Sequence, residues 1–405
     1  MTGPRSSAEH ILLAERFCAR NYLPLPVVLA RGEGCFVWDV EGNRYLDGLS
    51  GYSALNQGHR HPRIVAALVE QAGRLTLTSR AFHNDRMGPF LSRLCALAGF
   101  PLALPMNTGV EAVETAVKAM RRWGYEQKGI PAGRAELVVV TGNFHGRTLL
   151  AISLSDDPSS YAGYEPQVPG IVRVPFGDAA ALAAAVGPHT AGVLLEPVQG
   201  EAGVVIPPDD YLPRVREICT ARRVALCLDE VQTGLGRTGR MFAWEHWDTR
   251  PDLVCLGKAL SGGVYPISAV CGTEELLGVF TPGTHGSTYG GNPLAAAVGM
   301  AALDVLVEEE LPQKAARLGR VALRRLHAEL DGAPPVKEVR GLGLMLAVEY
   351  HRPVAHRLVE RLAREAAVLC KDTRGTTIRF LPPLVTPEEE LLQALDRMLP
   401  ILALG

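Results

Sequence analysis

Short apolar runs alternate with helical stretches through the middle of this chain, and this alternation constrains the fold more than any other feature. Their hydrophobicity is continuous rather than alternating, which is typical of strands covered on both faces. Between two of them, residues 210–223 carry apolar side chains at helical spacing. We therefore predict an α/β fold with a mainly parallel sheet covered by helices. The runs are ELVVVTG (136–142), AGVLLEP (191–197), VALCLDE (224–230), DLVCLG (252–257) and PISAVCG (266–272).

The chain of 405 residues is long enough for a large domain and a smaller one. After Pro293 the sequence becomes alanine-rich and helical to about residue 330, and a strand pair, a helix and a last strand follow. This order is typical of a small α+β domain. Near the N-terminus, GCFVWDVEGNRYLDGLS predicts two short strands around a Gly-Asn turn. We predict an N-terminal segment (1–45) that joins the small domain, a large domain (46–293) and the C-terminal small domain (294–405).

The charge balance, the lengths of the apolar runs and the cysteine spacing argue against a nucleic-acid-binding, membrane or disulfide-rich secreted protein. Lysine plus arginine (41) nearly equals aspartate plus glutamate (43), so no net field attracts nucleic acid or an anionic membrane. No apolar run approaches the roughly 18 residues of a membrane span, and the N-terminus lacks a signal-peptide core. Eight dispersed cysteines without a C-x-x-C pair are typical of reduced thiols. We expect a cytoplasmic protein with no nucleic-acid, membrane or metal partner.

Lys258 directly follows the apolar run LVCL, with a glycine before it and two glycines shortly after it. Desolvating an ammonium group costs several kcal/mol unless the charge is paired or neutralised. One interpretation is that the side chain extends to solvent, which is the favoured reading for any single lysine. The other is that burial lowers the pKa and makes the amine a nucleophile, as Schiff-base chemistry requires.

Asp229 also ends an apolar run, in LCLDEVQTG. Aspartate is almost never fully buried unless it is paired. Its partner is either an arginine or a helix N-terminus, or else a protonated ring nitrogen whose positive charge the carboxylate maintains. The aspartate alone slightly favours the first of these.

The segment MNTGVEAVETAVKAM (106–120) predicts a helix that begins near Thr108 and Gly109. Thr108 and Glu111 have the spacing of a capping box, which needs no ligand. The same helix start can bind a phosphate, because free N–H groups, the helix dipole and a hydroxyl converge there. Taken alone, the segment favours the cap.

The loop GNFHGRT (142–148) offers an aromatic side chain and an arginine after the strand LVVVT. Phe144 either packs on the sheet edge or stacks on a flat heteroaromatic ring. Arg147 either lies on the surface as a solvated charge or binds a carboxylate through two N–H groups of its guanidinium. Together, a phosphate cup, a stacking ring, a buried carboxylate and a buried lysine are the requirements of one cofactor, pyridoxal 5'-phosphate.

Three long strings carry a family resemblance: LDEVQTGLGRTG, LGKALSGGVYPISAV and HGSTYGGNPLAA. The sequence resembles the class III pyridoxal-phosphate-dependent aminotransferases of fold type I from about residue 20 to the C-terminus. The resemblance implies a large domain with a mainly parallel sheet, a smaller α+β domain, and a homodimer or higher assembly with shared active sites.

The resemblance also implies the roles of the cofactor-binding residues. Lys258 would carry the cofactor covalently and later shuttle a proton, and Asp229 would pair with the pyridine nitrogen. Phe144 would stack on the ring. The other contacts would be Gln232 with the 3-oxygen, Thr108, Gly109 and Val110 with the phosphate, and Thr288 with the phosphate site of the neighbouring subunit.

Within the family, the chain is most similar to the members that use ornithine, which implies transfer of the δ-amino group of L-ornithine to 2-oxoglutarate, in proline biosynthesis and arginine metabolism. Arg379 and Glu201 match the arginine that binds the α-carboxylate of the oxo acid and the glutamate that masks it. Arg147 matches the arginine that grips the distal carboxylate. Tyr22 and Tyr52 match residues that hold the α-carboxylate and α-amino end of ornithine.

One departure from this pattern bears on the substrate. His145 stands where ornithine-using members often carry tryptophan, and FHGRT resembles the YHGRT of members that use acetylornithine. The alternative is therefore a related ω-aminotransferase that acts on N-acetylornithine, 4-aminobutyrate or lysine. A binding protein on the same scaffold is disfavoured, because Lys258, Asp229 and the phosphate segment are all present.

Overall fold

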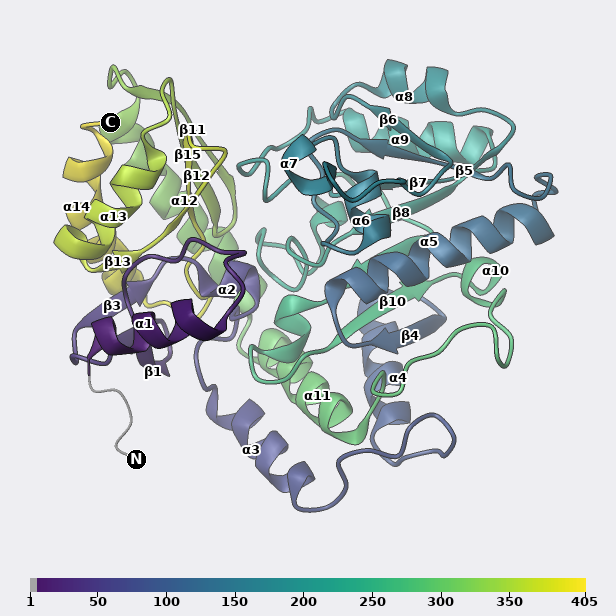
Figure 1. Cartoon of the computed structure of the whole chain (residues 1–405), viewed down its shortest axis with the longest axis horizontal. Helices are drawn as coiled ribbons and strands as arrows, with labels where there is room; N and C mark the ends of the chain where they lie inside the picture. The colour runs from purple at the N-terminus through teal and green to yellow at the C-terminus, as the bar shows by residue number, and fades with distance from the viewer. Residues whose placement is uncertain (1–5) are drawn as a thin grey trace.

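A seven-stranded sheet organises the larger part of the molecule in the computed structural model, which describes residues 6–405 (Figure 1). The strand order is β4-β10-β9-β8-β7-β5-β6. The strands from β9 to β6 run parallel, and β10 is antiparallel to both of its neighbours. The predicted mainly parallel sheet is confirmed. Its strands are β4 (Leu102–Met106), β5 (Glu136–Val140), β6 (Ile171–Val174), β7 (Thr190–Leu195), β8 (Ala225–Asp229), β9 (Leu253–Leu256) and β10 (Ser268–Gly272).

Helices cover both faces of this sheet, which explains why its strands are apolar throughout. Every residue of β7, β8, β9 and β10 is buried. Alternate strand residues face two apolar clusters, one with α5 (Gly109–Glu126), the other with α8 (Ala179–Ala185) and α9 (Tyr211–Ala221). Burying a Val or Leu side chain contributes roughly 1.5–3 kcal/mol, so a two-sided sheet selects such residues at every position.

Two four-stranded sheets form the other side of the molecule (Figure 1). One has the order β1-β2-β3-β13 and contains the predicted hairpin, β2 with β3, around Gly42 at φ +90°. Strand β3 pairs in parallel with β13 through Leu46 and Val368, so the N-terminal strands share a sheet with the C-terminal segment. The strands are β1 (Leu29–Glu33), β2 (Phe36–Asp39), β3 (Arg44–Asp47), β11 (Val336–Leu342), β12 (Met345–Tyr350), β13 (Val368–Leu369), β14 (Lys371–Thr373) and β15 (Thr377–Phe380).

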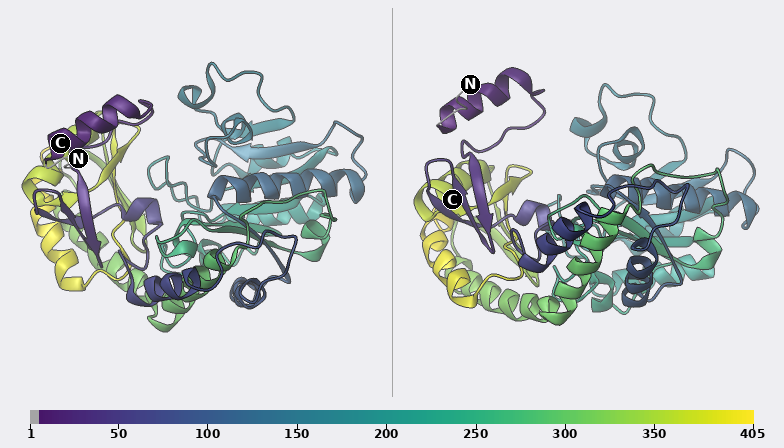
Figure 2. Two further views of the ribbon diagram at one scale, coloured as in Figure 1. Left: turned by 60° about the horizontal axis from the view of Figure 1, so that its bottom comes forward. Right: turned by 90° about the horizontal axis from the view of Figure 1, so that it is seen from below.

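Long helices connect the two sides. Helix α11 (Pro293–Glu308) packs against α3 and α4 near the large sheet and against α12, which reaches β11 (Figure 2). Helix α1 (Ser7–Phe17) has no buried residue and stands apart at the N-terminal end. The remaining helices are α2 (Ser50–Ser53), α3 (Pro62–Ala72), α4 (Met87–Ala98), α6 (Leu149–Leu154), α7 (Pro158–Tyr161), α10 (Glu274–Leu277), α12 (Leu311–Leu330), α13 (Ala355–Ala366), α14 (Glu388–Leu402), and the 3-10 helices η1 (Ala243–His246) and η2 (Lys258–Ser261).

No helix within residues 6–405 is both long and apolar enough to cross a membrane. The same residues contain no group of three or more His, Cys, Asp or Glu side chains arranged to hold a metal ion.

Candidate active site

One pocket gathers side chains from the carboxyl ends of four neighbouring parallel strands. His145 follows β5, Glu196 follows β7, Asp229 ends β8 and Lys258 follows β9. Ligands of open α/β sheets bind at this edge. The polar groups that the sequence places after separate strands therefore meet in one site. The pocket is lined by Gly109, Val110, Phe144, His145, Gly146, Glu196, Glu201, Asp229, Val231, Gln232 and Lys258.

Lys258, which lines this pocket, is held in an unusual backbone conformation. Its φ is +42°, and Gly257 before it is nearly fully extended. Such a conformation costs on the order of 1–3 kcal/mol in a residue other than glycine, and strain of this kind clusters at functional sites. Within residues 6–405 no hydrogen bond or ion pair holds its ammonium group. Desolvation lowers the pKa of Lys258, although Glu201 and Asp229 oppose the shift. The amine is therefore available as a nucleophile.

Asp229 is buried, and its partner is a histidine. Its Oδ2 lies 2.7 Å from Nδ1 of His145, and its Oδ1 accepts the N–H of Val231 at 3.0 Å. The arginine and the helix N-terminus considered from the sequence do not fill this place. Because the carboxylate also lines the pocket, it can still meet a positive group of a ligand.

The start of α5 has both features considered from its sequence, a capping box and a helix N-terminus that faces the pocket. The capping box is present, since Thr108 Oγ1 accepts the N–H of Glu111 and the Glu111 carboxylate accepts the N–H of Thr108. Gly109 and Val110 nevertheless line the pocket, and Thr108 lines an adjoining open hollow that Lys258 also borders. A helix N-terminus therefore faces the site with free N–H groups, as anion binding requires.

Glu196 is a site residue that sequence reasoning missed. Its carboxylate is buried and accepts the N–H of Phe144 at 3.0 Å. Burial raises its pKa to about 7, with His145 opposing the shift and Asp229 adding to it. The available signal was a charged residue after a fully apolar strand, which is the signal that identified Asp229.

Arg379 and Glu201 form a pair at the side of the site. Arg379, on β15, is 1% exposed, and its Nη1 lies 2.6 Å from Oε1 of Glu201. The ring of Tyr52 lies 5.3 Å from the guanidinium carbon. Although burial opposes it, Arg379 lowers the pKa of Glu201 below its usual range. The predicted arginine, its masking glutamate and one of the two tyrosines are therefore adjacent.

Six predicted site residues do not line this pocket: Thr108, Tyr52 and Arg379, described above, and Arg147, Tyr22 and Thr288. Arg147 is exposed, donates to Ser160 Oγ at 2.9 Å and lies 5.3 Å from the Phe144 ring. Tyr22 is 81% exposed, in the loop between α1 and β1. Thr288 is exposed in the segment before α11.

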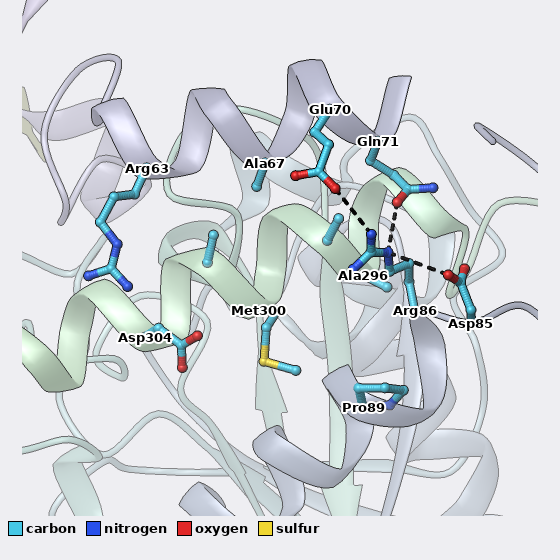
Figure 3. Close-up of a pocket in the computed structure, with 12 residues that line it drawn as sticks. Arg63, Ala67, Glu70, Gln71, Asp85, Arg86, Pro89, Ala296, Met300 and Asp304 are labelled. Carbon is cyan, nitrogen blue, oxygen red and sulfur yellow. Dashed lines mark hydrogen bonds and ion pairs between the residues drawn. The ribbon is translucent and has the colours of Figure 1, made fainter. Parts of the chain in front are cut away.

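A second hollow lies between α3, α4 and α11, away from Lys258 (Figure 3). Its charged side chains are already paired: Arg86 contacts Gln71 at 2.8 Å, Glu70 at 3.4 Å and Asp85 at 3.8 Å. Arg63 and Asp304, which also line this hollow, pair with Glu308 at 2.6 Å and with Arg93 at 3.1 Å. Since these charged side chains already have partners, the Lys258 pocket is the better candidate.

Comparison with known proteins identifies the family. The family model described as aminotransferase class-III matches residues 17–402. The chain belongs to the class III aminotransferases, which depend on pyridoxal phosphate and have the fold type I architecture. The residues of the pocket fit this cofactor, because they supply an unpaired lysine, a buried carboxylate and an open helix N-terminus.

Individual relatives are more specific. The chain is 52% identical to an ornithine aminotransferase of Geobacillus sp. (strain WCH70) over 98% of this chain and 99% of the relative. An ornithine aminotransferase structure from Toxoplasma gondii superimposes with a TM-score of 0.97 at 44% identity, covering 98% of this chain and 94% of the other. An acetylornithine aminotransferase structure from Elizabethkingia anophelis gives a TM-score of 0.90 at 44% identity, covering 99% and 100%.

Proposed function

We propose that this protein transfers the δ-amino group of L-ornithine to 2-oxoglutarate. The products are L-glutamate and glutamate 5-semialdehyde, which cyclises to pyrroline-5-carboxylate. The observation that carries the proposal is the Arg379–Glu201 pair beside Tyr52 at the Lys258 pocket. The similarity to ornithine aminotransferases over nearly the full chain supports it.

The two substrates make opposite demands on Arg379. The reacting carbon of ornithine carries no carboxylate, so an uncovered arginine beside it would remain buried without a partner, which is costly. Glu201 removes that cost by pairing with Arg379 at 2.6 Å. The reacting carbon of 2-oxoglutarate does carry a carboxylate, which Arg379 binds once Glu201 turns away. Arg147 grips the distal carboxylate of the same substrate.

Two tyrosines select the amino donor. Tyr52 lies against Arg379, and its pKa is raised first by burial and then by Glu201, with a smaller contribution from Tyr22. In our proposal both hold the α-carboxylate and α-amino end of ornithine, which leaves the δ-amino group to reach the lysine.

The remaining residues hold the cofactor and move protons. Pyridoxal phosphate supplies an electron sink when it is bound. Lys258 would hold it covalently through its amine and would be the base that moves a proton during the amino transfer. Asp229 would accept a hydrogen bond from its ring nitrogen, Gln232 would contact its 3-oxygen, and Phe144 would stack on its ring. Thr108, Gly109 and Val110 would bind its phosphate.

We also propose a cytoplasmic homodimer that serves proline biosynthesis and arginine metabolism, in which the partner subunit's Thr288 completes each phosphate site. The exposure of Thr288 supports this, because a side chain that faces outward is free to serve a neighbour. The four-stranded sheet β1-β2-β3-β13 supports joining the first segment to the third in our division into residues 1–45, 46–293 and 294–405, although the two residues of β3 that pair with β13, Leu46 and Asp47, lie just past the first boundary.

The test is a panel of amino donors with 2-oxoglutarate, read by glutamate formation. Ornithine should be turned over faster than N-acetylornithine, 4-aminobutyrate or lysine. Weak turnover of ornithine beside strong turnover of N-acetylornithine would favour the alternative, a related ω-aminotransferase that acts on N-acetylornithine. The similarity to the acetylornithine aminotransferase structure from Elizabethkingia anophelis is the observation that favours this alternative.

A further inference from the structure

We propose that Ser50 is a positioning residue for Tyr52: its hydroxyl ties a left-handed turn to the strand of Arg379 and so sets where the Tyr52 ring lies. The inference rests on the proposed function only in taking Tyr52 as a residue that selects the amino donor. It goes further by naming the side chain that fixes the position of Tyr52, and through it the preference among donors.

The turn that carries Tyr52 has a backbone conformation that L-amino acids avoid. The φ angles of all four residues of α2 are positive: 51° at Ser50, 55° at Gly51, 58° at Tyr52 and 72° at Ser53. With ψ of 41° at Gly51 and 46° at Tyr52, this is a left-handed helical turn. Only glycine adopts this conformation routinely, and normally as a single residue. The turn therefore needs surroundings that hold it in place.

Two side chains supply bonds that hold the start of the turn. Asp47 Oδ1 accepts the N–H of Leu49 at 2.9 Å and the N–H of Ser50 at 2.8 Å. The other carboxylate oxygen of Asp47 lies 2.7 Å from Nε2 of His59, which orients the carboxylate. The second side chain is Ser50 itself, whose hydroxyl donates to the carbonyl oxygen of Leu381. Asp47 thus holds the turn to its own segment, whereas Ser50 holds it to a distant one.

The segment that Ser50 reaches is the one that carries Arg379. Arg379 lies on β15, two residues before Leu381, and Tyr52 lies two residues after Ser50. The N–H of Leu381 also donates to the carbonyl of Gly48 at 2.7 Å. These hydrogen bonds join the two segments close to the point where the Tyr52 ring lies 5.3 Å from the Arg379 guanidinium carbon. The placement of the ring on the guanidinium therefore depends on them.

Ser50 can influence the site only through other residues. Its side chain is fully buried and does not line the Lys258 pocket, so its hydroxyl has no place beside a substrate or cofactor. Ser50→Ala removes the donor to Leu381 and leaves a residue other than glycine at positive φ. We therefore expect the turn to relax toward ordinary backbone angles and to carry the Tyr52 ring away from Arg379.

The direct test is the environment of the Tyr52 ring in the holoenzyme without substrate. Incorporated fluorotyrosine gives a fluorine NMR signal for each tyrosine, and a Tyr52→Phe variant identifies that of Tyr52. Ser50→Ala should shift or broaden this signal, while the signal of Tyr211, on α9, stays in place. An unchanged Tyr52 signal in a folded Ser50→Ala variant would overturn the proposal.

The second test asks whether Ser50 acts through Tyr52. In Ser50→Ala the ratio of kcat/KM for ornithine to kcat/KM for 4-aminobutyrate should fall roughly threefold to tenfold, the effect of one ordinary hydrogen bond. In a Tyr52→Ile background the same substitution should leave the ratio nearly unchanged, because the side chain that Ser50 positions is absent. An equal fall in both backgrounds would contradict the proposal.

Ser50→Gly is the second variant, because glycine adopts positive φ freely but lacks the hydroxyl. It should reproduce both effects of Ser50→Ala, and it carries the test if thermal unfolding shows that Ser50→Ala is not folded. Unchanged fluorine signals in Ser50→Gly would then count against the role of the hydroxyl.

The matched control is Thr249→Val, which removes another buried hydroxyl. Thr249 Oγ1 donates to the carbonyl of Trp247 at 3.0 Å and does not line the pocket. Its fluorine signals and donor ratio should equal those of the unaltered protein. Because the fluorine signal is read without any amino donor, a shifted Tyr52 signal supports the positioning role even if ornithine is not the substrate. The donor panel alone tests the substrate.

Discussion

The Arg379 guanidinium lies 2.6 Å from the Glu201 carboxylate, while the backbone of Glu201 is anchored from another direction. Thr373 Oγ1 donates to the Glu201 carbonyl at 2.6 Å, and Arg340 donates to the carbonyl of Gly203 at 2.7 Å. Strands β14, β11 and β15 thus fix the loop that carries Glu201. Opening the pair therefore requires only a rotation of the glutamate side chain, with the backbone held in place.

Removing the charge of Glu201 should favour the half-reaction with the oxo acid over the half-reaction with ornithine. In Glu201→Gln the attraction for Arg379 falls, so we expect a lower KM for 2-oxoglutarate and a severalfold lower kcat/KM for ornithine. Separate half-reactions, followed by the absorption of the bound cofactor, distinguish the two effects. The control is Glu308→Gln, an exposed carboxylate that pairs with Arg63 and does not line the pocket. Equal changes in both half-reactions would contradict the masking role.

Replacing Tyr52 should weaken the selection of ornithine. The Tyr52→Ile side chain keeps apolar bulk beside Arg379 but loses the hydroxyl, so the ratio of ornithine to 4-aminobutyrate turnover should fall. Steady-state kinetics with both donors measures the ratio, and Tyr164→Ile, at a residue 60% exposed, is the control. If the ratio is unchanged in Tyr52→Ile, our assignment of this residue is wrong.

Lys258 should make the cofactor-free protein less stable at neutral than at alkaline pH. Desolvation lowers its folded-state pKa below the ordinary 10.5, so the unfolded chain binds more protons between the two values and stability rises with pH there. The Lys258→Met side chain has no charge to desolvate, so at pH 7 this variant should have a larger free energy of unfolding than the unaltered protein. The difference between the two proteins should shrink as the pH approaches about 10. Urea unfolding measures this, and exposed Lys314→Met should show no such trend.

Glu230 should produce the opposite slope at lower pH. Its carboxylate is buried, and burial raises its pKa from 4.5 to about 8, although the N–H groups of Ala243 and Trp244 donate to it. The folded state therefore binds more protons than the unfolded chain between these values, and stability falls as pH rises through them. Glu230→Gln should flatten this part of the curve in urea unfolding. Exposed Glu274→Gln should keep the slope of the unaltered protein.

The sequence predicts those parts of the site that follow from local pattern. Lys258 and Asp229 stand out because each charged residue follows an uninterrupted apolar strand, and the Thr108–Glu111 cap follows from a spacing of three residues. Both features depend on neighbours along the chain. The same is true of the β2–β3 hairpin, which its turn residues specify.

The partners in the site could not be predicted, because they depend on strand order. Asp229 meets His145 only because β8 and β5 both lie beside β7, which brings the loop after β5 over the end of β8. No spacing in the sequence encodes that arrangement. The exposure of Tyr22 is equally beyond local pattern, since it depends on where the loop after α1 lies.

The parallel pairing of β3 with β13 has a consequence for synthesis of the chain. Leu46 emerges from the ribosome long before Val368, its partner in the sheet, so β3 presents an open edge until almost the whole polypeptide has been made. An unpaired strand edge is a template for association with other chains. Nascent chains should therefore need protection of β1–β3 during translation, and the pairing of β3 with β13 should be a late step of folding.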